Sequence, residues 1–163
     1  MPKSANELAS EIEGAMGESW LPRTYCERIL KMRTRAYEFP ALPKNATPQV
    51  HHTLLGIELK VGRRRMLCPD LATARYLAVF ARLGCKAIAI PYDITKISQV
   101  ADELESSWHR MLLLAEQRGH HDSESARARV RRLLIDRVRD QIATAGAGAR
   151  APEFRTTTKQ RRR

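Results

Sequence analysis

Glu58 and Lys60 are the residues whose types and spacing are best suited to chemistry in this chain. They lie in the run Gly56-Ile57-Glu58-Leu59-Lys60, in which apolar and polar side chains alternate. Because successive side chains of a strand point to opposite faces, a carboxylate and an ammonium group two positions apart share one face. Such a carboxylate can bind a divalent metal ion, and the ammonium group can stabilise an attacking water or a developing negative charge. The spacing therefore brings a carboxylate and an ammonium group together on one face of a strand.

A strand, a turn, a helix and a second strand must position this pair. We expect β structure over residues 50–68, where Gly62-Arg63 turns the chain and Met66–Cys68 forms a short return strand. A helix is predicted from its cap Asp70 to Leu83, where Gly84 stops it. The apolar run Lys86–Ile90 then reads as a buried strand. The unit is β, β, α, β.

This order, with Glu58-x-Lys60 in its strand, resembles the core of the PD-(D/E)xK nuclease superfamily, and loosely its Holliday-junction resolvases. The resemblance covers about Val50 to Tyr92. It implies a metal-dependent nuclease in which Mg²⁺ is the cofactor, Glu58 is a metal ligand, and Glu58 and Lys60 are the catalytic residues. The family also places an acidic residue on the preceding strand, and the sequence has none there. The second carboxylate would have to come from Glu38, Glu11 or Glu27.

The remaining segments predict a mixed fold of helices and strands. Helical periodicity and capping residues predict four further helices, at about Ser4–Gly17, Thr24–Arg35, Ile94–Gln117 and Ser123–Ala143. Three prolines make the segment from Glu38 to Pro48 an extended connection or an edge strand. We expect the α/β (α+β) class, with a small mixed sheet and a β-hairpin flanked by helices. Residues 1–143 would form one domain that ends in a basic amphipathic helix, followed by a disordered basic tail over 144–163.

Positive charge points to the class of partner. The chain has 29 Lys and Arg against 18 Asp and Glu, a net charge of +11, and such a surplus attracts polyanions. Basic residues gather in three places: the predicted second helix, the hairpin and the tail. We predict a protein that binds nucleic acid, DNA or RNA, and needs no cofactor for binding. The predicted phosphate contacts are Arg33, Arg35, Lys60, Arg63, Arg64, Arg65, Arg161, Arg162 and Arg163.

Other readings stay open beside this one. The arginines of the hairpin could be solvated turn residues, and the last two helices could join a partner protein or a second copy of the chain. The sequence shows no secretory signal and no apolar run of membrane-spanning length, so we expect a soluble, cytoplasmic protein with no membrane partner. The three cysteines, Cys26, Cys68 and Cys85, are expected to be buried free thiols.

Histidines and aromatic residues allow sharper expectations. The neighbours His51 and His52 should point to opposite faces of a strand, which disfavours a shared metal ion. The run from His120 to Asp122 reads as a polar turn between two helices. Helical spacing places Phe80 and Trp108 in the core. The aromatic residues near basic ones, which are candidates to stack on bases, are Trp20, Tyr25 and Tyr37.

Overall fold

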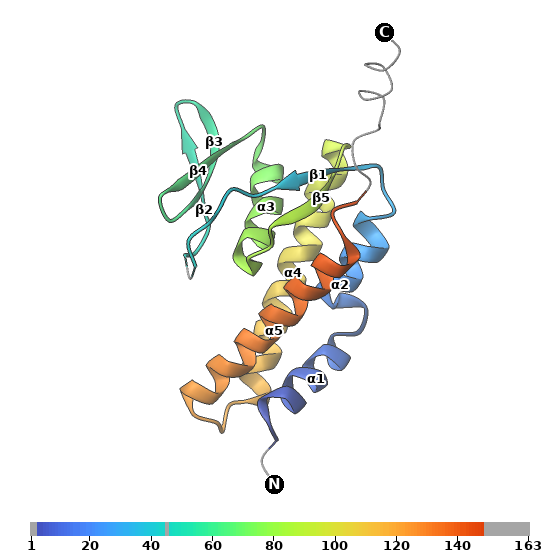
Figure 1. Cartoon of the computed structure of the whole chain (residues 1–163), viewed down its shortest axis with the longest axis vertical. Helices are drawn as coiled ribbons and strands as arrows, with labels where there is room; N and C mark the ends of the chain where they lie inside the picture. The colour runs from blue at the N-terminus through green and yellow to red at the C-terminus, as the bar shows by residue number, and fades with distance from the viewer. Residues whose placement is uncertain (1–2, 45, 149–163) are drawn as a thin grey trace, which may run out of the picture.

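A computed structural model describes residues 3–44 and 46–148 and combines helices with two small antiparallel sheets (Figure 1). The α/β class is confirmed. The helices are α1 (Ala5–Met16), α2 (Leu21–Thr24), α3 (Leu71–Leu83), α4 (Ile94–Arg118) and α5 (Glu124–Ala145), with short 3₁₀ and π turns at Gly17–Ser19 and Tyr25–Ile29. The strands are β1 (Thr34–Glu38), β2 (Gln49–Thr53), β3 (Gly56–Val61), β4 (Arg64–Cys68) and β5 (Ala87–Pro91).

Capping side chains fix where four of the helices begin. The hydroxyl of Ser4 accepts from the backbone N–H of Glu7 at 3.1 Å, and a carboxylate oxygen of Asp70 accepts from the N–H of Thr73 at 2.7 Å. Asp93 and Ser123 cap α4 and α5 in the same way. These bonds satisfy backbone donors that the first helical turn leaves free. The predicted helices at 4–17, 70–83, 94–117 and 123–143 are confirmed within one or two residues.

The predicted helix from Thr24 to Arg35 is confirmed only in its first part, up to Ile29, and is wrong beyond it. Helical structure begins earlier, at Leu21, and passes into a π turn that ends at Ile29, where the N–H of Leu30 bonds to the carbonyl of Tyr25. The chain then becomes strand β1. Its partner strand β5 lies about fifty residues further along the chain, and this tertiary pairing outweighs the local helical pattern.

The expected single mixed sheet is divided into two antiparallel sheets. β1 pairs with β5, while β2, β3 and β4 form a three-stranded meander. The run expected as one strand from Val50 to Val61 is broken by a turn at Leu54-Leu55, so that two hairpins replace one. Strand Ala87–Pro91 is confirmed, but it belongs to the other sheet from Glu58.

The two sheets lie together at one end of the molecule, and α1, α4 and α5 lie side by side towards the other (Figure 1). α3 packs against both α4 and the inner side of the meander. The inner side chains of the meander, such as Leu59, Val61 and Met66, are buried in the same core as Phe80 and Trp108. The core positions expected for these two aromatic residues are confirmed.

Two tyrosine hydroxyls bind the backbone of β5 on the side that faces away from β1. Tyr25 Oη accepts from the N–H of Ala89 at 2.9 Å and donates to the carbonyl of Gly146 at 2.6 Å. Tyr76 Oη donates to the carbonyl of Ala89. The segment after α5 is therefore held against β5, and a Cβ atom added at Gly148 would lie 2.5 Å from Oγ1 of Thr34.

The predicted disordered tail over 144–163 falls mostly outside the described residues, which end at Gly148. Its first two residues, Thr144 and Ala145, belong to α5. In the described part of the chain, no helix combines the length and the apolar content that crossing a lipid bilayer requires.

Candidate nucleic-acid interface

One side of the meander faces solvent and carries most of the polar side chains of its three strands, among them Glu58 and Lys60. The strand register places side chains in rows across the three strands. Gln49, Lys60 and Arg65 form one row, and His51, Glu58 and Leu67 form the next. We call this side the outer face; its residues are Gln49, His51, Thr53, Glu58, Lys60, Arg65 and Leu67. The expectation that Glu58 and Lys60 share one face of a strand is confirmed.

Two cations of the outer face lie directly opposite each other. Lys60 on β3 is the register partner of Arg65 on β4. Like charges at such positions destabilise a sheet, because their Cβ atoms are only about 5 Å apart. Glu58 offsets part of this repulsion, since its Oε1 lies 3.7 Å from Nε of Arg65. Among residues 3–44 and 46–148, no acidic side chain forms a salt bridge with Lys60.

The side chains of the three consecutive arginines of the hairpin, Arg63 to Arg65, do not share one face. Arg63 lies in the turn with Gly62, while Arg64 and Arg65 belong to β4. Arg64 is opposite Val61 and so belongs to the inner side, although it is exposed at the end of the strand. Only Arg65 joins Lys60 on the outer face. The sequence placed all three at one tip, and the strand alternation separates them.

A second group of cations lies on and before β1. Arg33 places its guanidinium carbon 5.1 Å from the ring centre of Tyr92, a cation–π contact. Arg35 is exposed on β1. Gly148, the last described residue, lies against the buried side chain of Thr34, which points to the opposite face of β1 from the side chain of Arg35. Arg161, Arg162 and Arg163, the predicted phosphate contacts of the tail, lie outside the described residues.

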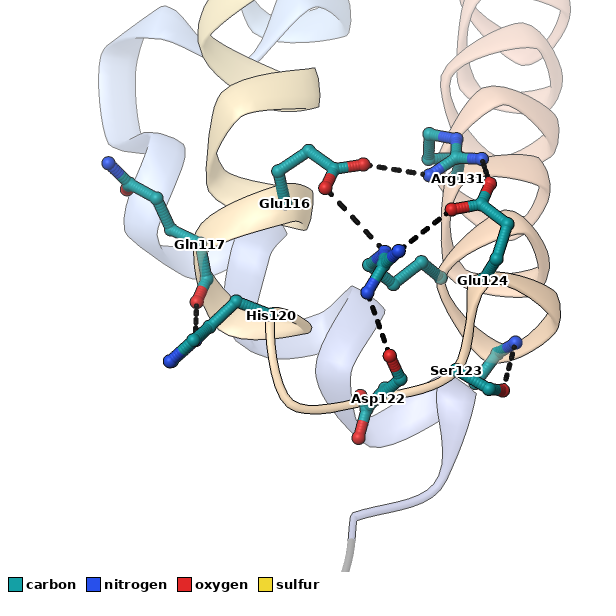
Figure 2. A network of polar contacts seen from close by, with 9 residues as sticks. Glu116, Gln117, His120, Asp122, Ser123, Glu124 and Arg131 are labelled. Atoms are coloured by element: carbon teal, nitrogen blue, oxygen red, sulfur yellow. Dashed lines mark hydrogen bonds and ion pairs between the residues drawn. The ribbon is translucent and has the colours of Figure 1, made fainter.

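The arginines of the helices are used differently, because acidic side chains of the same protein neutralise them. Figure 2 shows Arg131 of α5 held between Glu116 of α4 and Glu124, at 3.0 and 2.8 Å. Arg127 binds the same two carboxylates, and its guanidinium also donates to the backbone carbonyl of Asp122. These contacts join α4 to α5 at their connecting turn. Four of the six arginines of α5, the helix predicted to be basic, are thus engaged in internal ion pairs.

The same holds for other helical cations. Arg75 of α3 binds both Asp102 and Glu105 of α4, and these contacts raise its pKa further above its already high ordinary value. Arg137 of α5 reaches Glu13 of α1 at 3.4 Å. Arg28, expected in a binding helix, pairs with Glu103 at 2.9 Å. By contrast, the segment 31–69, which contains strands β1 to β4, holds eight Lys and Arg against two Glu, so it carries about half of the chain's surplus of positive charge.

The carboxylates considered as partners for Glu58 in a metal site are engaged elsewhere. Glu11 pairs with Lys3 at 2.6 Å, which holds the pKa of its carboxyl below the ordinary value, and Glu27 pairs with Arg23 at 2.7 Å. Glu38 lies at the end of β1, opposite Ala87 in the other sheet. Within the described ranges, no three His, Cys, Asp or Glu side chains come together in a way that could hold a metal ion.

Several other expectations are settled by burial. Two of the three aromatic candidates for base stacking are wrong, because Trp20 and Tyr25 are buried. The third, Tyr37, is half-buried. Trp20 donates its indole N–H to Gln141 at 2.8 Å. Cys68 and Cys85 are buried as expected, but Cys26 is exposed.

The histidines behave as the turn and strand patterns predicted. His120 Nδ1 lies 2.9 Å from the carbonyl of Gln117, within the polar turn between α4 and α5 (Figure 2). His51 lies opposite Glu58 on the outer face and His52 lies opposite Ile57 on the inner side. Sequence reasoning missed the nearness of His51 to Glu58. The feature that could have revealed it is the turn at Leu54-Leu55, which places His51 opposite Glu58, seven residues further along the chain.

Comparisons with protein-family models, with curated proteins and with solved structures found no match to this chain.

Proposed function

We propose that this protein binds nucleic acid through the end of the molecule that carries the two sheets. The outer face would contact phosphates through Lys60 and Arg65. Arg33 and Arg35 on the neighbouring sheet, Arg63 and Arg64 at the hairpin, and the basic tail would extend the contact along the strand. The partner is DNA or RNA, and binding itself requires no metal ion.

The observation that carries this proposal is the Lys60–Arg65 pair. Two cations placed directly opposite each other on an exposed sheet weaken the fold unless an anion lies between them. Glu58 reaches only one of them. A phosphate group has several acceptor oxygens, so it can bind both cations at once and relieve their repulsion.

The contrast with the helices supports the same conclusion. Arg127, Arg131 and Arg137 have the same charge as the sheet residues, but carboxylates of α1, α4 and α5 already neutralise them. A cation in an internal ion pair attracts a polyanion less, because its field is cancelled nearby. The distribution of ion pairs therefore favours the sheet end over the helical end as the binding region.

The experiment is a salt titration of binding to labelled duplex DNA, single-stranded DNA and RNA. Each phosphate neutralised by the protein adds about 0.9 to the logarithmic salt slope for a duplex and about 0.7 for a single strand. We expect Lys60→Ala and Arg65→Ala each to weaken binding and to lower the slope by about one contact. Arg131→Ala is the matched control, since it removes one positive charge from the helical end.

The outcomes separate the alternatives. Equal weakening by Lys60→Ala and Arg131→Ala would show that total charge matters and the outer face does not. Absence of binding at low salt would overturn the proposal, and an oligomer in sizing at high salt would then favour a protein–protein adaptor built on α4 and α5. Parallel reactions with Mg²⁺ test the nuclease resemblance, which requires cleavage that Glu58→Ala abolishes while binding survives.

A further inference from the structure

Glu58 is the one feature of the outer face that phosphate binding does not explain. It is the only acidic residue between Lys44 and Asp70. Its side chain is 14% exposed and lies against Arg65. A carboxylate in the middle of a basic surface repels the phosphates that the surface attracts. A carboxylate at this position is useful, however, if it takes a proton from the bound molecule.

His51 lies directly opposite Glu58 on the neighbouring strand. Side chains in this relation have Cβ atoms about 5 Å apart, and both reach outward from the sheet. Gln49 Oε1 lies 3.1 Å from Nε2 of His51, so it can accept a hydrogen bond from that nitrogen and orient the ring. Nδ1 then remains available. The outer face thus brings together a carboxylate and an imidazole, the two side chains used most often for general base and acid catalysis.

The row beside them supplies the remaining part of a reaction site. Lys60 is two positions from Glu58 on the same strand, and Arg65 lies opposite Lys60. Two cations next to an acid–base pair can bind the oxygens of a phosphodiester that do not react, and stabilise the charge that develops on them. Displacement at phosphorus requires a base at the attacking oxygen and an acid at the leaving oxygen, on opposite sides of the phosphorus atom. Side chains on two adjacent strands can meet this requirement.

We propose that the outer face cleaves single-stranded RNA without a metal ion, using the 2′-hydroxyl of the substrate as the nucleophile. Glu58 takes the proton of the 2′-hydroxyl while O2′ forms a bond to the adjacent phosphorus. The bond from phosphorus to O5′ breaks, and Nδ1 of a protonated His51 donates a proton to O5′. The products are a 2′,3′-cyclic phosphate and a 5′-hydroxyl, no water is consumed, and solvent returns the proton from Glu58 to His51.

Roles follow for each residue of the site. Glu58 and His51 are the catalytic residues, Lys60 and Arg65 hold the phosphate, and Gln49 is a positioning residue that acts through His51. Single-stranded RNA is the expected substrate because attack in line with the leaving oxygen needs a flexible backbone, which a duplex does not provide. DNA lacks the 2′-hydroxyl and would bind without being cut.

The inference rests on the proposed nucleic-acid binding, so binding and cleavage are measured separately. End-labelled single-stranded RNA, the same sequence as DNA, and an RNA with one 2′-deoxy position are incubated with the full chain in excess EDTA. We expect the RNA alone to be cut, no cut at the deoxy position, and cyclic phosphate ends by mass spectrometry. Glu58→Gln and His51→Ala should each lower the rate about 10²–10⁴-fold while RNA affinity stays within a few-fold.

The neighbouring histidine provides a matched control. His52→Ala removes an imidazole one residue away, from the inner side of the same strand, and it should leave the cleavage rate unchanged. Glu38→Gln provides the same control for a carboxylate on the other sheet. All variants are purified identically, which excludes a contaminating ribonuclease, and thermal unfolding by circular dichroism checks that each one folds.

Four results would overturn the inference. RNA binding without cleavage by the unaltered chain would leave the binding proposal standing and remove the catalytic one. Equal cleavage by the unaltered chain and His51→Ala would assign the activity to another site or protein. Cleavage of DNA, or cleavage only with Mg²⁺, would identify a different chemistry. Loss of RNA binding altogether would overturn both proposals at once.

Discussion

Replacing Tyr25 by phenylalanine removes one hydroxyl group that holds two distant backbone segments together. This hydroxyl accepts from the N–H of Ala89 on β5 and donates to the carbonyl of Gly146 after α5. The aromatic ring stays in place, packed edge-on against Phe80 with ring centres 5.7 Å apart. The substitution therefore changes hydrogen bonding and leaves the packing of the core intact.

The expected loss of stability depends on whether the two backbone groups that bind the hydroxyl can bind water in its place. Ala89 is completely buried, so its N–H finds no water when the tyrosine hydroxyl is removed, and an unsatisfied buried group costs about 1–3 kcal/mol. Gly146 is partly exposed, so its carbonyl can bind water instead and adds little. We expect Tyr25→Phe to lower the free energy of unfolding by about 2 kcal/mol, which corresponds to about 4–8 °C in melting temperature.

Urea denaturation followed by circular dichroism measures this loss, with an unchanged m value showing that the folded state is the same. Tyr92→Phe is the matched control, because Tyr92 is exposed and its hydroxyl makes no hydrogen bond to the described residues. It should change stability by less than about 0.5 kcal/mol. If Tyr25→Phe also stays below this value, the reasoning is refuted, and the hydroxyl does not hold the segment after α5 against β5.

The same tyrosine predicts a dependence on alkaline pH. Burial raises the pKa of Tyr25 from 10.0 to about 12. A hydroxyl that must stay protonated in the folded state contributes its full stability below pH 10 and loses it as pH rises through 12. Tyr25→Phe should remove part of this alkaline loss. Burial raises the pKa of Tyr76 as well, so some of the loss will remain.

Two further predictions concern a turn and the thiols. Gly62→Ala should lower stability by more than about 1 kcal/mol in urea denaturation, because Gly62 has a φ of 61° and an added Cβ would lie 2.6 Å from a neighbouring proline ring. A stability equal to that of the unaltered chain would show that this turn is free to adjust. In native protein, a thiol reagent at pH 8 should modify Cys26 rapidly and leave Cys68 and Cys85 until denaturant is added, since burial raises the pKa of Cys85 to about 12. Rapid modification of all three would contradict the buried positions.

The ends of the main helices could be predicted from the sequence because they depend on local contacts. Ser4 and Asp70 bind backbone groups only three residues ahead, and Gly84 ends α3 with a φ of 79°, which glycine adopts without strain. The common face of Glu58 and Lys60 was equally predictable, since it follows from the alternation of a single strand. Such features need no knowledge of the rest of the chain.

Strand β1 shows where local reasoning failed. Residues after Thr24 have a pattern that fits a helix, but Thr34–Glu38 satisfies its backbone by pairing with β5, a segment that the local pattern cannot reveal. The arginines of α5 show that local reasoning also fails to predict which charges are neutralised. The sequence gives their positive charge, whereas the packing of α5 against α1 and α4 decides that carboxylates neutralise them.

The outer face depends both on the local strand pattern and on the tertiary fold. The sequence alone determined a strand with a carboxylate and an ammonium group on one side, beside a surplus of positive charge. The register across β2, β3 and β4 decided that His51 lies opposite Glu58 and that Arg65 lies opposite Lys60. That register depends on the turn at Leu54-Leu55, and a shift by one residue would move every side chain of a strand to the other face. Alternation along a strand is a local property of the backbone, while the neighbours across strands are set by the tertiary fold.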